Sequence, residues 1–230
     1  MLAAKLISVV IIGYLLGSIP FGYLIARRRA KFDIRNWGSG KIGTTNVLRT
    51  LGKKAAATVM LLDVGKGALA VILAGFIVST EYVLVDGNKV WWLLPGAQAL
   101  AALAAVAGHI WPVFLGFKGG RGVATFFGGL IALCPAAALF GGEVLILSAG
   151  LTRYASLGSI AGAVGTYSIL VPLTILNGFP VEYLLYGLLG SVIVIFMHRD
   201  NILRLISGKE RKLGEKAAPL TPPKPPRGEQ

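Results

Sequence analysis

The segment Gly38–Arg49, GSGKIGTTNVLR, combines residue types that bind phosphate groups. Its Gly-x-Gly-x-x-Gly spacing lets backbone N–H groups approach an anion closely. Side-chain donors follow at short intervals, and arginine suits bidentate phosphate binding; these donors are Ser39, Thr44, Thr45, Asn46 and Arg49. The segment is therefore a candidate anion-binding loop. The alternative is a flexible glycine-rich loop whose basic residues serve only membrane topology.

Neither common nucleotide motif fits this segment. A dinucleotide-binding fingerprint needs a strand before the glycines and an acidic residue about 20 positions later, whereas here an apolar run and a basic stretch precede Gly38. A Walker A loop ends in Gly-Lys-Ser/Thr, whereas Gly43 is followed by Thr44. The anion is therefore not a nucleotide bound through either motif.

A second segment, Phe117–Thr125, repeats this chemistry. Lys118 and Arg121 flank and interrupt a glycine-rich turn before a predicted helix, where N–H groups and the helix dipole bind anions; the glycines are Gly119, Gly120 and Gly122. A tight cytoplasmic turn is the alternative. Two such segments on one membrane face favour a site for phosphorylated ligands.

Two further pairs have helical i, i+3 spacing. Ser156 and Ser159 follow Arg153, and a helix N-cap is the structural interpretation of these serines. His198 and Asn201 lie on one helical face if the segment continues as helix.

Three ionisable residues lie within apolar runs. Asp63 and Lys66 can neutralise one another, which indicates a structural pair. His109 is either functional or the donor of a structural hydrogen bond to a neighbouring loop. The sequence has no Gly-x-Ser-x-Gly elbow, no cluster with metal-ligand spacing, and no His-x-x-x-x-Asp acyltransferase signature.

The composition indicates a bilayer as the solvent for these segments. The chain is 55% hydrophobic and 14% charged, whereas soluble domains carry about 25% charged residues. Its net charge of +13 falls in clusters between apolar runs, which the positive-inside rule explains better than nucleic-acid binding does. A single cysteine, Cys134, excludes an intrachain disulfide framework.

Apolar runs of spanning length predict an all-α integral membrane protein: Leu2–Ala26, Ala55–Ser79, Val90–Phe114, Leu157–Leu176 and Val181–Met197. The remaining run, Val123–Leu151, is broken by Cys134-Pro135. If it crossed once, the later basic clusters would lie outside. A hairpin of two short helices puts every basic cluster in the cytoplasm, with the N-terminus outside and seven helical segments in all.

The domain prediction is a membrane domain over residues 1–207, followed by a charged, proline-rich tail over residues 208–230. The tail cannot bury apolar surface, so we expect it to be solvated and disordered.

The chain resembles the bacterial acyl-phosphate:glycerol-3-phosphate acyltransferases, integral inner-membrane enzymes. The resemblance runs in order through YLLGSIPFGYLIA, GSGKIGTTNVLRTLGKK, LLDVGKGALAV, GHIWPVFLGFKGGRGVAT, TRYASLGS and HRDNILRLISGKE. It implies a seven-helix fold, an active site facing the cytoplasm, and acyl transfer to the sn-1 hydroxyl of glycerol-3-phosphate. It also implies lysophosphatidic acid as product, acyl phosphate as donor, no cofactor, and membrane lipid as surroundings, with no nucleic acid or obligate protein partner.

The resemblance also implies roles for individual residues. The catalytic group would be Ser39, Arg49, His198 and Asn201. Substrate phosphates would be bound by Thr45, Asn46, Lys118, Gly119, Gly120, Arg121, Gly122 and Ser156, with Glu210 structural and no metal ligand. The chain departs from the family at Lys41 and Thr44, where Asn and Ala are more common.

A transporter of a phosphorylated metabolite is the rival interpretation. Transporters bind substrate near the membrane midplane, often at inverted repeats and broken helices. Here the polar motifs gather at one face, which favours an interfacial enzyme.

Overall fold

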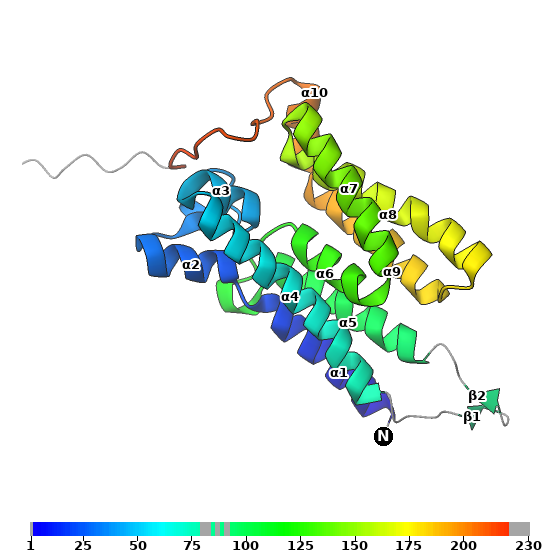
Figure 1. Cartoon of the computed structure of the whole chain (residues 1–230). Helices are drawn as coiled ribbons and strands as arrows, with labels where there is room; N and C mark the ends of the chain where they lie inside the picture. The colour runs from blue at the N-terminus through cyan, green and yellow to red at the C-terminus, as the bar shows by residue number, and fades with distance from the viewer. Residues whose placement is uncertain (1, 79–83, 86–87, 90–92, 221–230) are drawn as a thin grey trace, which may run out of the picture.

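The computed structural model describes residues 2–78, 84–85, 88–89 and 93–220. The described chain is almost wholly helical (Figure 1), with α1 (Leu2–Ser18), α2 (Phe21–Ala30), α3 (Thr44–Leu51), α4 (Lys53–Val78), α5 (Leu93–Ile110), α6 (Val123–Leu133), α7 (Pro135–Thr152), α8 (Ala155–Asn177), α9 (Val181–Met197) and α10 (Arg199–Ile206). Two 3-10 turns, η1 (Ile34–Asn36) and η2 (Val113–Leu115), and a short antiparallel pair, β1 (Leu84–Val85) with β2 (Asn88–Lys89), complete it.

Within the described residues, five helices are long and apolar enough to cross a membrane, or six if α9 and α10, which meet at 59°, form one span. Four of the five, Leu2–Ala30 (α1 with α2), α4, Leu93–Leu115 (α5 with η2) and α8, match predicted spans, and α9 has the predicted bounds, Val181–Met197. The fifth, α7, lies in the run that was predicted to be a hairpin. The first residues of the run predicted from Val90 lie outside the described residues. The placement of the N-terminus outside the cell stays a prediction.

The first apolar run differs from its prediction because it is two helices, not one. Proline has no N–H to donate within a helix, and α1 ends before Pro20 while α2 begins after it. The break frees the carbonyl of Ile19, and the ammonium group of Lys66 on α4 donates to it at 2.9 Å.

The run over residues 123–151 forms two helices, α6 and α7, with the predicted break at Cys134 and Pro135. Only α6 is short, because α7 has 18 residues and is itself long and apolar enough to cross a membrane. At about 1.5 Å per residue, the 11-residue α6 is too short to cross a bilayer alone. α6 packs directly on α4. The helices are so close at Gly128 that a side-chain carbon there would collide with the backbone carbonyl of Val64. This close approach holds α6 against α4.

Two loops at one end of the bundle precede α3 and α6. Loop 1 is residues 31–43 and loop 2 is residues 111–122. Ile34 and Ile42 anchor loop 1 by packing in a buried apolar cluster with Val47 and Val59. The polar residues of loop 1 are therefore presented from a fixed backbone.

The C-terminal segment corrects one prediction. Residues 209–220, here called the strap, were expected to belong to a solvated, disordered tail. Most of them are exposed, but backbone hydrogen bonds hold them in order against loop 1 and the α7–α8 junction (Figure 1). The N–H of Gly38 donates to Ala218 at 2.9 Å, that of Leu220 to Asn36 at 2.9 Å, and that of Leu213 to Arg153 at 2.7 Å. Backbone hydrogen bonds order the strap, so it needs little buried apolar surface. Residues 221–230, the rest of the expected tail, lie outside the described residues.

Candidate active site

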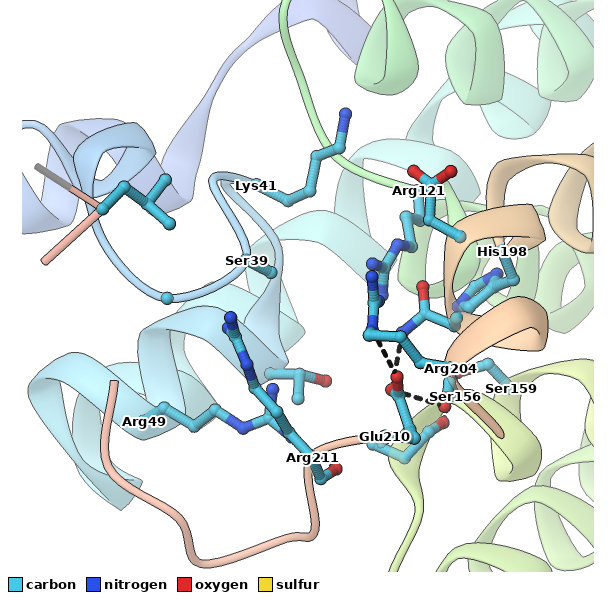
Figure 2. A pocket seen from close by; sticks show the side chains of 16 residues that line it. Ser39, Lys41, Arg49, Arg121, Ser156, Ser159, His198, Arg204, Glu210 and Arg211 are labelled. Atoms are coloured by element: carbon cyan, nitrogen blue, oxygen red, sulfur yellow. Dashed lines mark hydrogen bonds and ion pairs between the residues drawn. The ribbon is translucent and has the colours of Figure 1, made fainter. Parts of the chain in front are cut away.

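A pocket of about 240 Å³ opens where the two loops meet the C-terminal elements. Five segments line it: loop 1 with the start of α3, loop 2, the start of α8, the junction of α9 and α10, and the strap. The close view in Figure 2 shows side chains from all five pointing into one space. The topology thus brings together four of the polar segments singled out in the sequence.

Loop 1 and α3 contribute Ser39, Lys41, Thr45 and Arg49 to the lining. Asn46, predicted to bind phosphate, does not line the pocket and is 2% exposed. Its amide nitrogen donates to backbone carbonyls of loop 1, among them Trp37 at 2.9 Å and Lys41 at 2.8 Å.

The amide oxygen of Asn46 accepts the Ser39 N–H at 3.1 Å. Asn46 therefore stabilises the backbone conformation of loop 1, and this conformation places Ser39 at the pocket.

Arg49 is half-buried and fixed by the strap. Its Nη2 donates to the backbone carbonyls of Arg211 at 3.0 Å and Lys212 at 3.3 Å. Burial lowers the pKa of Arg49 first, and the positive charge of Arg211 lowers it further. The guanidinium still stays protonated at neutral pH, because an arginine pKa lies above about 12 at the outset.

Loop 2 contributes only Arg121 to the lining. The Gly119 N–H donates to Ile110 at 3.1 Å and the Gly120 N–H donates to His109 at 3.0 Å, so the two glycines pack on the end of α5. A side-chain carbon at either position would collide with His109. The two positions are therefore glycine because the loop backbone lies close to the end of α5, and not because it lies close to an anion.

The other predicted residues of loop 2 also stay out of the pocket. Lys118 is exposed, and Gly122 adopts a left-handed φ of 83° just before α6. Arg121 is mostly buried, and desolvation is the main reason that its pKa falls to about 10. It remains charged at neutral pH.

A buried charge cluster lies under loop 2. Lys66 Nζ is 2.8 Å from Asp63 Oδ1, and His109 Nδ1 is 3.4 Å from the same oxygen. All three side chains are at most 3% exposed. The expected Asp63–Lys66 pair is therefore present, and the side chain of His109 joins it.

The carboxylate of Glu210, in the strap, accepts hydrogen bonds from side chains on two helices, α8 and α10. Its Oε1 accepts from Ser156 Oγ at 2.9 Å and Asn201 Nδ2 at 2.6 Å, and its Oε2 accepts from Arg204 Nε at 2.8 Å. Burial by itself raises the pKa of Glu210, but hydrogen bonds from Asn201, Arg204 and Ser156 together bring it below the usual range. The carboxylate ties the start of α8 to α10, an arrangement compatible with the expected structural role.

His198 lies between α9 and α10 and is 2% exposed. Its Nδ1 is 2.8 Å from the Val194 carbonyl. Because a carbonyl only accepts, Nδ1–H donates and Nε2 is the acceptor of the neutral ring. Burial, followed by the charge of Arg121, lowers the pKa of His198 to about 4, so the ring is neutral at pH 7.

Residues outside the predicted catalytic and phosphate-binding sets also line the pocket, among them Lys41, Ser159, Asp200, Arg204, Arg211 and Leu220. A signal existed for Arg204, which follows Asn201 at i, i+3 and so shares its helical face. No local pattern marked Arg211, because its position depends on how the strap folds back.

Comparisons with known proteins agree with this architecture. Residues 7–208 match the sequence profile of the family described as glycerol-3-phosphate acyltransferase. The chain is 64% identical over 217 residues to glycerol-3-phosphate acyltransferase 3 of Dehalococcoides mccartyi strain CBDB1, covering 94% of this chain and all of that protein. It is 44% identical to the Shouchella clausii glycerol-3-phosphate acyltransferase, covering 93% and 98% of the two chains.

Two solved structures of PlsY, an integral membrane glycerol 3-phosphate acyltransferase, share the fold. The glycerol 3-phosphate form aligns with a TM-score of 0.78 and 39% identity over 91% of this chain and 96% of that one. The lysophosphatidic acid form aligns with a TM-score of 0.75 and 37% identity over 91% and 95%. The chain, a multi-pass bacterial membrane protein, therefore belongs to the glycerol-3-phosphate acyltransferase family.

Proposed function

We propose that this protein transfers a fatty acyl group from acyl phosphate to the sn-1 hydroxyl of glycerol-3-phosphate, which yields lysophosphatidic acid and phosphate. The observation that supports this most is the charge of the pocket. Five cationic side chains line it against two acidic ones, and one of those acids, Glu210, is already bound to Arg204. Two phosphorylated substrates would balance this excess.

The matched structures support the choice of substrates. PlsY has been solved in a glycerol 3-phosphate form and in a lysophosphatidic acid form, which are an acyl acceptor and its acylated product. The donor is proposed from chemistry, because acyl phosphate is a mixed anhydride with phosphate as a good leaving group. A site that only positions reactants and stabilises charge can then suffice.

In the proposed reaction, the sn-1 oxygen attacks the acyl carbonyl carbon, the bond from that carbon to the phosphate oxygen breaks, and phosphate leaves with the bonding electrons. Arg49 and Arg121 hold the phosphate groups, while Ser39 and Asn201 orient the reacting groups. Asn201 Oδ1 is buried and has no hydrogen-bond partner among the described residues, so it is available as an acceptor.

The proton of the attacking hydroxyl has two candidate acceptors. One is Nε2 of His198, whose pKa of about 4 makes it a weak base at neutral pH. The other is an oxygen of a substrate phosphate, for which a second pKa of about 6 is typical. Burial lowers the pKa of His198 and so weakens it as a base, whereas a phosphate oxygen reaches the hydroxyl on the substrate itself. We therefore favour the phosphate, with His198 positioning the hydroxyl.

We place the reaction on the cytoplasmic side of the bacterial inner membrane. The pocket is built from the basic loops, and such loops stay in the cytoplasm by the positive-inside rule. The acyl chain would extend from the pocket between helices that face lipid.

The test uses purified full-length protein in detergent, supplied with acyl phosphate and glycerol-3-phosphate but no coenzyme A. Lysophosphatidic acid and inorganic phosphate should form in equal amounts. Uptake of glycerol-3-phosphate into vesicles with no acylation would instead support a transporter.

A further inference from the structure

The strap brings an additional cation, Arg211, into the pocket. The match to the family profile ends at residue 208, so Arg211 lies beyond it. On one side of Arg211, Glu210 fixes the strap to α10. On the other side, the Leu213 N–H donates to the Arg153 carbonyl at 2.7 Å, and Arg153 Nη2 donates to the Leu213 carbonyl at 3.2 Å. Arg211 is therefore anchored on both sides.

Arg211 lies directly against Arg49. Arg49 Nη2 donates to the backbone carbonyl of Arg211 at 3.0 Å, and the carbonyl of Arg49 accepts the Ala217 N–H at 3.2 Å. Both side chains line the pocket, and in Figure 2 they lie on the side away from Arg121 and His198. The pocket thus has two separate groups of positive charge.

Nearby carboxylates form no direct ion pair with Arg49 or Arg211 among the described residues. Burial lowers the pKa of Arg49, although the charges of Glu210 and Glu215 act to raise it. Glu210 is already bound to Arg204 at 2.8 Å. Half-buried Arg49 and exposed Arg211 place two positive charges beside one another at the pocket, and like charges disfavour each other unless an anion lies between them.

We infer that Arg211 is a further substrate-binding residue, which forms with Arg49 a subsite for one phosphate group. Arginine suits this role because its planar fork gives two parallel hydrogen bonds to phosphate oxygens. The inference rests on the proposed function for the identity of the ligand. The phosphate could be that of glycerol-3-phosphate or that of the acyl donor, and the experiment below separates the two.

The experiment compares Arg211→Gln with Lys216→Gln in the full-length protein. Lys216 is an exposed strap residue that does not line the pocket, so its substitution removes the same charge without touching the subsite. Affinity for inorganic phosphate and for glycerol-3-phosphate is measured by calorimetry, and KM is measured for each substrate with the other saturating.

We expect R211Q to weaken inorganic phosphate binding and to raise KM for one of the two substrates about tenfold to hundredfold, the usual effect of losing a hydrogen bond to a charged group. A higher KM for glycerol-3-phosphate identifies the acceptor phosphate, and a higher KM for the donor identifies the acyl phosphate. Lys216→Gln should change all values less than about twofold, as for a distant exposed charge.

Equal changes in R211Q and K216Q would overturn the inference, because Arg211 would then act only through net charge. Should R211Q not fold, as judged by its melting temperature, Arg211→Lys replaces it. A lysine keeps the charge but loses the planar fork, so weaker phosphate binding supports the subsite and unchanged binding overturns it.

This design also separates the subsite from the reaction. If R211Q loses phosphate binding but the unmodified protein forms no lysophosphatidic acid, the subsite stands and the proposed function fails. If lysophosphatidic acid forms and R211Q binds phosphate normally, the function stands and the subsite fails.

Discussion

At the scale of single residues, Ser39 and Asn46 have different roles although both lie in one polar segment. Ser39 lines the pocket, whereas Asn46 is buried and hydrogen-bonded to the loop backbone. We expect Ser39→Ala to lower kcat about 100-fold or more, as for loss of one donor at a reacting centre, with an unchanged melting temperature. Turnover assays and thermal unfolding in detergent test this. Near-normal turnover of this variant would show that Ser39 has no role in the reaction.

Asn46→Ala should instead destabilise the fold. It leaves several backbone carbonyls and the Ser39 N–H without their partner, at a cost of about 1–3 kcal/mol. Its melting temperature should fall by about 2–4 °C for each kcal/mol, and activity should fall as the loop loosens. A variant with normal stability and low activity would show that Asn46 contacts substrate after all.

His198 makes stability depend on pH. Its pKa is about 4 in the folded protein against an ordinary 6.5, so between these values the unfolded chain binds more protons than the folded one. Stability is therefore highest above pH 6.5 and falls as the pH is lowered toward 4. His198→Asn, which can still donate to the Val194 carbonyl, should show a shallower loss between pH 6.5 and 4.5. Melting temperatures of the two proteins are measured across this pH range. An equal fall in melting temperature for both proteins would contradict the prediction.

At the scale of elements, loop 2 shows why glycines are ambiguous in sequence. The spacing of Gly119, Gly120 and Arg121 suits an anion site, but only the arginine reaches the pocket. A glycine that permits close approach to a phosphate looks the same as one that permits close approach to a helix end. Hydrophobic runs were more informative, because the bounds of α4, α8 and α9 lie within about two residues of the apolar runs that predicted them.

Gly120→Ala should therefore act through His109. Its added carbon collides with the imidazole ring, so loop 2 must shift and Arg121 with it. We expect a loss of turnover of about tenfold or more, in line with misplaced positioning groups, together with a lower melting temperature. Gly142→Ala is the matched control, because its side-chain carbon meets nothing within 4 Å. Similar behaviour of the two variants would show that loop 2 does not depend on this contact.

At the scale of the whole molecule, the strap was the part that sequence reasoning missed. Its composition is charged and rich in proline, which ordinarily indicates disorder. Its order comes from backbone hydrogen bonds to Gly38, Asn36 and Arg153, and these depend on the positions of loop 1 and α7. No single-segment pattern encodes such a contact, whereas the four polar segments could be predicted to meet once the membrane spans were counted.

That count makes a final prediction about orientation. Arg121 before α6 and Ser156 after α7 line one pocket, so we predict that this helix pair returns the chain to the side from which it entered. Lys54, Tyr154 and Lys216 should then all face the cytoplasm and Glu182 the outside. Single cysteines at these positions, in a Cys134→Ala background, are treated with an impermeant maleimide on intact cells. Cysteine at 182 should react at once, and the other three only after permeabilisation. Labelling of position 154 from outside would mean that α6–α7 crosses once, so that the start of α8 could not share a pocket with loop 1.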